Sequence, residues 1–223
     1  IKVKDTEQKK ALNNWAKKGF NGSIIAGTGF GKSRCGVIAV AKTLSDGGKG
    51  LVLVPTHQLQ EQFKEEFIKW GYESVLDNVD ILCYASAYKL EDQHYDVVVC
   101  DEIHLGLSPE YRKFFENNTW DRMLCMTATL PEDYEYKELL YKIAPLVYMI
   151  SLDECVALGL VSPYEIVCIP IQLTDLEQKE YKKANNTFVY AKYCLGQFGA
   201  FDRAKHIMGA GKHTASPEDK AAA

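Results

Sequence analysis

Apolar residues follow two alternating patterns along the chain: short continuous runs, and longer stretches in which they recur every three or four residues. A continuous run such as Gly50–Val54 is typical of a strand that is covered on both faces. Turn residues such as glycine, proline and aspartate separate the patterns. The runs that predict strands are residues 23–26, 50–54, 79–84, 95–100, 122–126, 146–150 and 164–171.

The stretches between these runs predict helices. Leu59, Phe63 and Phe67, for example, share one face of a helix. Strands that alternate with helices predict an α/β fold, with a mostly parallel sheet flanked by helices on both faces. The carboxyl ends of such strands meet at one edge, where ligands bind. The expected helices cover residues 5–18, 35–44, 59–70, 86–90, 132–143 and 152–159, and Ser108-Pro109-Glu110 predicts one more helix start.

The last part of the chain has a different character. Thr174 and Glu177 fit a capping box, and Tyr181 and Phe188 belong to an apolar stripe with helical spacing. After Gly209 the sequence is rich in glycine, alanine and charged residues. We therefore expect two parts, a domain over residues 1–172 and a helical connector over residues 173–223.

Composition narrows the class of protein. The 223 residues carry a formal net charge of −4, so any contact with a polyanion must come from a local patch rather than from an overall positive field. Seven cysteines without a CxxC pair argue for a reducing compartment and against a disulfide framework. No apolar run has the length of a membrane span, and no secretory leader opens the sequence. We expect an intracellular, cytoplasmic protein that makes no membrane contact.

The segment Ala26–Ser33, with the sequence AGTGFGKS, lies between a predicted strand and a predicted helix. Glycines let the backbone turn tightly, so that its N–H groups and the helix N-terminus can face one point. Lys32 adds a mobile cation, and the Ser33 hydroxyl suits Mg²⁺. This pattern predicts a cradle for the phosphates of a nucleotide, formed by Thr28, Gly29, Gly31, Lys32 and Ser33. The alternative is an ordinary glycine-rich turn, since Ala26 stands where a P-loop usually has its first glycine.

Two carboxylates follow the buried strand predicted at residues 95–100. Next to a phosphate loop, the first carboxylate can hold Mg²⁺ and the second can position and deprotonate an attacking water. We assign Asp101 and Ser33 to the metal and Glu102 to the water, so that Lys32, Asp101 and Glu102 form the candidate catalytic set. The alternative reading of Asp101-Glu102 is a solvated acidic turn.

Four segments in order resemble motifs I, Ia, II and III of the DExH group of superfamily 2 helicases. They are AGTGFGKS (26–33), PTHQLQEQ (55–62), DEIH (101–104) and TAT (127–129). The chain is most similar to the branch of XPB-like and phage UvsW-like translocases and type III restriction motor subunits. The resemblance covers residues 5–172 and implies a RecA-like domain that binds ATP and Mg²⁺.

The resemblance also implies roles for single residues. Gln8 matches the glutamine that reads the adenine edge, although the aromatic residue often found just before it is replaced by Thr6 and Glu7; alternatively, Gln8 is a polar residue on a helix surface. The residues that match contacts to a nucleic-acid backbone are Pro55, Thr56, Gln58 and Ser86. The residues that match elements coupling the state of the nucleotide to the bound nucleic acid are His104, Thr127 and Thr129. Ser86 can alternatively be a helix cap, and His104 a hydrogen-bonded core histidine.

The function implied by the resemblance is that of a first motor domain in an ATP-dependent DNA helicase or translocase. Alternatives are a motor subunit of a restriction or defence nuclease, an RNA helicase, and a nucleic-acid-binding module without ATPase activity. The expected partners are nucleic acid, with DNA favoured by the branch, and a second RecA-like domain of the same polypeptide. That second domain supplies arginine fingers in this superfamily, and this sequence has only Arg34, Arg112, Arg122 and Arg203. We therefore expect slow hydrolysis by these residues alone.

Overall fold

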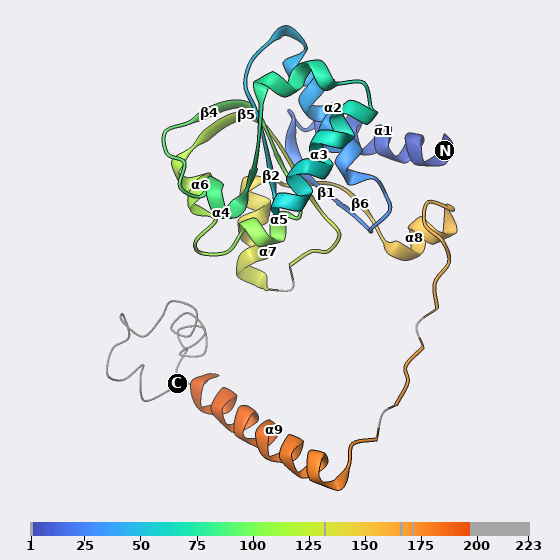
Figure 1. Ribbon diagram of the computed structural model, residues 1–223, viewed down its shortest axis with the longest axis vertical. Coiled ribbons are helices and arrows are strands. Elements are labelled where there is room, and N and C mark those ends of the chain that lie inside the picture. Colours follow the sequence, from blue (N-terminus) through green and yellow to red (C-terminus); the bar gives the residue numbers. More distant parts are fainter. Residues whose placement is uncertain (1, 132, 166, 171, 197–223) are drawn as a thin grey trace. The chain divides into compact units, whose positions relative to one another are not determined.

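A computed structural model describes residues 2–131, 133–165, 167–170 and 172–196 of the chain. The chain divides into two units, residues 1–164 and residues 165–223. The first unit is an α/β domain, and the described part of the second unit contains one helix, α9 (Asp175–Gly196) (Figure 1).

The core of the first unit is a sheet of six parallel strands in the order β3-β2-β4-β5-β1-β6. The predicted parallel sheet is thus confirmed. All strand ends that precede the predicted motifs lie at the same carboxyl edge, because the strands are parallel. The strands are β1 (Asn21–Ala26), β2 (Gly50–Val54), β3 (Val79–Cys83), β4 (His94–Cys100), β5 (Thr119–Thr127) and β6 (Leu146–Ile150).

Helices cover both faces of this sheet (Figure 1). Side chains alternate across a strand, so Val52 and Val54 of β2 belong to one buried cluster and Leu51 and Leu53 to another. The first cluster packs against α1 (Lys2–Lys17), α2 (Lys32–Thr43) and α3 (His57–Lys69). The second packs against α4 (Tyr84–Ala87), α5 (Ile103–Gly106), α6 (Lys113–Asn117) and α7 (Tyr134–Ile143). The remaining elements are the 3₁₀ turns η1 (Leu44–Asp46) and η2 (Glu73–Asn78), and α8 (Leu152–Ala157).

The strand order places the start of α2 at a branch point of the sheet. β1 lies between β5 and β6, whereas the next strand in sequence, β2, lies beyond β5 and β4. The chain therefore leaves β1, forms α2 and crosses two strands before it re-enters the sheet. Crevices at such topological switch points are the usual ligand sites of open α/β sheets.

Two predicted elements are wrong. The strand expected at residues 164–171 does not form among the described residues there, and Tyr164, Val167 and Ile169 are exposed, so they pair with no neighbouring strand that would bury them. The helix expected to start at Ser108 starts at Lys113. Residues 107–112 form turns instead, which bring the Tyr111 ring against the ring of Tyr84.

Helix α9 begins with the capping box predicted from the sequence. The Thr174 hydroxyl accepts a hydrogen bond from the Glu177 N–H at 3.4 Å, and the Thr174 N–H donates to the Glu177 carboxylate at 2.8 Å. Tyr181 and Phe188 are exposed on this helix. Residues 197–223, which include the end of the expected connector, lie outside the described residues. No described helix combines the length and apolar character needed to cross a bilayer.

Gly36 sets the distance between α2 and the sheet. A Cβ atom at this position would lie 3.0 Å from Val99 Cγ1, 3.1 Å from Met126 Cε and 3.1 Å from Phe63 Cζ. Gly36→Val is expected to lower the free energy of unfolding by about 1–3 kcal/mol through overpacking, despite the low helix propensity of glycine. Urea denaturation measures this change. Lys42→Val, which adds the same side chain at an exposed position of α2, should cost less, and equal costs would contradict close packing at Gly36.

Candidate phosphate-binding site

The loop between β1 and α2 adopts a backbone that requires glycine at two positions. Gly29 and Gly31 have φ angles of +91° and +87°, in the left-handed region that side chains rarely adopt. Space is also limiting at Gly31, because a Cβ atom there would lie 2.4 Å from Gln8 Nε2. The glycines predicted from the sequence are thus needed to form the loop as it stands.

Side chains of helix α1 hold this loop by hydrogen bonds to the carbonyl groups of the loop. Lys4 Nζ donates to the Gly29 carbonyl at 2.6 Å, and Gln8 Nε2 donates to the Phe30 carbonyl at 2.8 Å and the Gly31 carbonyl at 3.3 Å. In a trans peptide the N–H points away from the carbonyl of the same peptide unit. The Phe30 N–H donates within the loop, to the Gly27 carbonyl at 3.2 Å. The N–H groups of Gly31 and Lys32 follow the two carbonyls bonded to Gln8 and therefore point away from Gln8, on the side where an anion can be bound.

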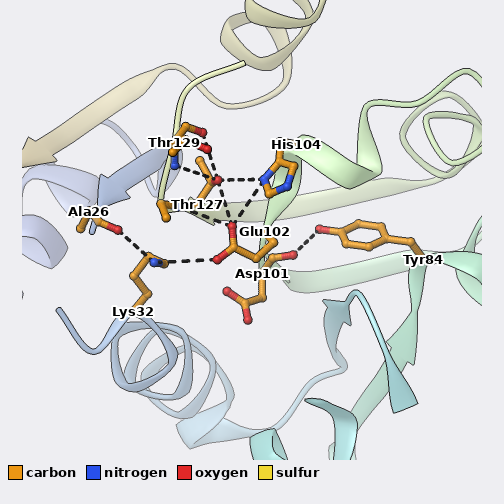
Figure 2. A network of polar contacts seen from close by, with 9 residues as sticks. Ala26, Lys32, Tyr84, Asp101, Glu102, His104, Thr127 and Thr129 are labelled. Atoms are coloured by element: carbon orange, nitrogen blue, oxygen red, sulfur yellow. Dashed lines mark hydrogen bonds and ion pairs between the residues drawn. The ribbon is translucent and has the colours of Figure 1, made fainter. Parts of the chain in front are cut away.

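Lys32 and Glu102 come together at the carboxyl edge of the sheet, although 70 positions separate them in the sequence. Lys32 Nζ donates to the Ala26 carbonyl at 2.9 Å and lies 3.9 Å from Glu102 Oε1 (Figure 2). Lys32 is buried, with 9% of its surface exposed. Its ammonium group has three N–H donors, so it can keep the bond to Ala26 and still donate to a phosphate.

Asp101 is a buried carboxylate beside this pair. The pKa of its carboxyl is raised to about 6, mainly by burial and also by the negative charge of Glu102, while Lys32 partly opposes both effects. The Asp101 backbone is fixed on both sides, since its N–H donates to the Leu53 carbonyl at 2.8 Å and its carbonyl accepts from the Tyr84 hydroxyl at 2.9 Å. A nearby cation stabilises the charged form of a carboxylate that is buried and fixed in this way.

Asp101 and Ser33 line one cavity of about 310 Å³, which Gln62 and Glu66 of α3 also border. Mg²⁺ prefers oxygen ligands and is usually held by one or two carboxylates together with substrate phosphates. The Ser33 hydroxyl and the Asp101 carboxylate fit that requirement. Among the described residues, no group of three or more His, Cys, Asp or Glu side chains forms a closed metal site.

The Glu102 side chain belongs to a hydrogen-bond network that connects the ends of β4 and β5. The Thr127 hydroxyl lies 3.0 Å from Glu102 Oε2 and 3.0 Å from His104 Nδ1, and it accepts from the Thr129 N–H at 3.3 Å (Figure 2). The Ala128 N–H also donates to Glu102 Oε2, at 3.4 Å. The three residues predicted to couple, His104, Thr127 and Thr129, are therefore brought together around Glu102.

The structure decides three of the alternatives. Gln8 is not a surface residue, because only 2% of it is exposed. Ser86 is not the cap of its helix, because α4 already begins at Tyr84. The side chain of His104 is hydrogen-bonded but 37% exposed, so it is not a core histidine.

The predicted nucleic-acid contacts lie at the carboxyl edge, but apart from the Glu102 network. Thr56, Gln58 and Ser86 are exposed, and Pro55 is half-buried. Thr56 also caps α3, where its hydroxyl accepts from the Leu59 N–H at 3.4 Å. Thr28 of the phosphate loop is exposed as well.

Sequence reasoning missed the side chains that support the loop from outside it. Lys4 contacts a loop carbonyl, and Arg34 bonds to both Gln8 and Asp5. Trp70 is the last residue of the helix expected at residues 59–70, and its ring lies against the Arg34 guanidinium.

Comparison with known proteins agrees with this site. Residues 5–94 match the family model described as DEAD/DEAH box helicase. Over this segment, which carries the phosphate loop and the segment PTHQLQEQ, the chain is therefore similar to the DEAD/DEAH box helicases. The family resemblance predicted from the motifs is thus confirmed.

One curated relative and two solved structures are similar to this chain. The DNA 3'-5' helicase XPB of Mycobacterium tuberculosis is 25% identical over 206 residues, which cover 82% of this chain and 36% of that protein. The UvsW helicase from bacteriophage T4 has a TM-score of 0.51 at 15% identity, over 65% of this chain and 58% of the other. The Pyrococcus furiosus Hef helicase domain has a TM-score of 0.53 at 15% identity, over 89% of this chain and 48% of the other. The chain therefore spans about a third of the length of the XPB relative.

The raised pKa of Asp101 predicts a pH-dependent stability. The folded protein keeps a proton on Asp101 up to about pH 6, whereas the unfolded chain releases it near the usual value of 3.8. The contribution of this group to stability therefore falls as pH rises from about 4 to about 6, by on the order of 3 kcal/mol. Asp101→Asn removes this fall, so the variant should be more stable than the native protein at pH 7.5 and gain little at pH 4.

Urea denaturation at the two pH values measures this difference. Asp77→Asn at an exposed position serves as the control and should show no such pH-dependent gain. An Asp101→Asn variant that gains equally at both pH values would show that Asp101 is not held in a charge-disfavouring site.

Proposed function

We propose that this chain is the first motor domain of an ATP-dependent DNA helicase or translocase, which binds ATP with Mg²⁺ and hydrolyses it. The observation that carries the proposal is the 3.9 Å approach of Lys32 Nζ to Glu102 Oε1, beside the buried Asp101, at the end of the phosphate loop. The match of residues 5–94 to DEAD/DEAH box helicases supports ATP as the nucleotide.

Each group of the site has a separate task in this proposal. The loop N–H groups and the Lys32 ammonium bind the phosphates and stabilise charge that develops on them. Ser33 and Asp101 are the residues that would hold Mg²⁺, which supplies further neutralisation of phosphate charge. Glu102 orients the attacking water and accepts its proton.

The network around Glu102 supports a coupling role for His104, Thr127 and Thr129. Glu102 Oε2 shares the Thr127 hydroxyl with His104, so a change in the charge or position of Glu102 alters the hydrogen bonds at the end of β5. We infer that this is how the state of the nucleotide reaches the segments that contact nucleic acid.

The nucleic-acid partner is proposed to bind across the exposed residues Thr56, Gln58 and Ser86, together with Pro55 in the turn between β2 and α3. Small polar side chains at helix starts contact the sugar-phosphate backbone without reading bases, which suits a motor that passes every sequence. DNA is favoured over RNA because the XPB relative is a DNA helicase.

A second RecA-like domain completes the proposed enzyme. Each arginine of the described residues is engaged away from Glu102: Arg34 with Asp5, Arg112 with Glu116 and Arg122 with Thr43. Arginine fingers contribute about 10³–10⁵ to the rate of phosphoryl transfer, so these residues alone should hydrolyse ATP slowly. The free cysteines of the described residues fit the proposed reducing, intracellular location.

Two variants separate binding from hydrolysis. Lys32→Ala should weaken ATP·Mg²⁺ binding by about ten-fold or more, because it removes the buried cation. Glu102→Gln should keep ATP binding but slow single-turnover hydrolysis by about 100-fold, because the amide cannot accept the proton. Titration calorimetry measures binding, and release of labelled phosphate measures hydrolysis.

The matched control is Lys42→Ala, which removes an exposed lysine from the same helix and should change neither quantity. ATP binding that survives Lys32→Ala would contradict the proposed ATP site. Rapid DNA-stimulated turnover by the 223 residues alone would contradict the need for a second domain.

The nucleic-acid surface makes a separate prediction. Ser86→Glu places a negative charge at the proposed backbone contact and should weaken binding of a labelled single-stranded DNA by about ten-fold. Fluorescence anisotropy with DNA and RNA of the same sequence measures the effect and the preference between them. Ser45→Glu makes the same change at an exposed residue of η1, near the opposite edge of the sheet, and should have little effect. Equal effects of both substitutions would argue against a contact at Ser86.

A further inference from the structure

A second cavity adjoins the phosphate loop. It has a volume of about 510 Å³, within the range of small-molecule sites. Its lining includes Gly31 and Ser33 of the loop region, Asp5 and Gln8 of α1, and Arg34 and Trp70. We propose that Arg34 and Trp70 form the platform on which the base of the bound nucleotide stacks. The inference rests on the proposed ATP site and concerns how that site holds the base.

The cavity shares part of its lining with the cavity that contains Asp101. Ser33 and Glu66 line both this cavity and the smaller one that contains Asp101. The two cavities therefore adjoin one another past the first turn of α2. A nucleotide with its terminal phosphates near Lys32 and Asp101 extends past Ser33, and its base enters the larger cavity.

The platform is held in place before any base arrives. The Arg34 guanidinium carbon lies 4.1 Å from the centroid of the Trp70 ring. Arg34 NH1 donates to Gln8 Oε1 at 2.7 Å and bonds to the Asp5 carboxylate, and Trp70 Nε1 donates to Glu66 Oε2 at 2.7 Å. Planar guanidinium and indole groups both stack on nucleobases, and a fixed platform loses little conformational entropy on binding.

Gln8 is poorly placed to select the base by itself. Its amide donates to the carbonyls of Phe30 and Gly31, and its oxygen accepts from Arg34. A primary amide has two N–H donors, so both are committed to the loop. Thr6 and Glu7 supply no aromatic ring before Gln8, and Trp70, from the end of α3, brings one to the same cavity.

Stacking tolerates different bases because each base has a π face. With the donors of Gln8 committed to the loop, we expect ATP and GTP to bind within about five-fold of one another. Trp70→Ala should weaken both by about ten-fold, whereas Mg²⁺ tripolyphosphate, which has phosphates but no base, should bind equally to variant and native protein. Trp70→Phe should restore most of the ATP affinity. Titration calorimetry on the 223-residue protein gives all these values.

Ile68→Ala is the matched control, because Ile68 is an exposed apolar residue of α3 two positions before Trp70. It should leave ATP and tripolyphosphate binding unchanged. Fluorescence provides a second measurement that does not need the alanine variant to fold: ATP should quench the native emission, and Trp70→Phe should remove that quenching while Trp15 and Trp120 remain.

The binding results test the stacking platform and the ATP site separately. If Lys32→Ala abolishes ATP binding but Trp70→Ala leaves it intact, the platform is wrong and the ATP site stands. A loss of tripolyphosphate binding equal to the loss of ATP binding in Trp70→Ala also overturns the platform. If neither ATP nor tripolyphosphate binding depends on Lys32, the ATP site itself is wrong.

Discussion

The site depends on like charges held together at the edge of a sheet. Asp101 and Glu102 follow a strand buried on both faces, and Lys32 is the buried cation beside them. Burial raises the pKa of Asp101 most, the negative charge of Glu102 adds to this effect, and Lys32 offsets only part of it. The fold tolerates this imbalance because the hydrogen bonds of the sheet and the packing of both faces fix the Asp101 backbone. In the proposed function, a cation brought with phosphates would relieve it, which would tie ligand binding to the stability of the domain.

The conformation of the glycine-rich loop also depends on the residues around it. Its glycines permit the turn, but α1 determines how the peptide units face, because Lys4 and Gln8 hold three successive carbonyls. The helix that precedes the first strand is therefore part of the phosphate site. Gln8 remains predicted to contact the nucleotide, and in this structure its amide already supports the loop.

Local sequence patterns were enough to predict the parallel sheet, the phosphate loop and the carboxylates after β4. Each rests on a short segment: a continuous apolar run, a glycine-rich turn or a polar pair at a strand end. The Arg34–Trp70 contact could not be predicted, because it joins the first turn of α2 to the end of α3. The strand expected at residues 164–171 does not form for a related reason, since an apolar run does not by itself supply a neighbouring strand. At Ser108, where the sequence predicts a helix start, the structure has turns, and these turns stack the Tyr111 ring on the Tyr84 ring.

The hydrogen bond of Tyr84 links two parts of the site mechanically. Its phenol reaches from the first residue of α4 to the backbone carbonyl of Asp101, and both partners are buried (Figure 2). A hydrogen bond of 2.9 Å tolerates only a small displacement before it breaks. The Tyr84 side chain thus links the short helix that carries Ser86 to the peptide that carries Asp101. A force on the outer surface of α4 is therefore transmitted through this one side chain to the peptide that carries the carboxylates.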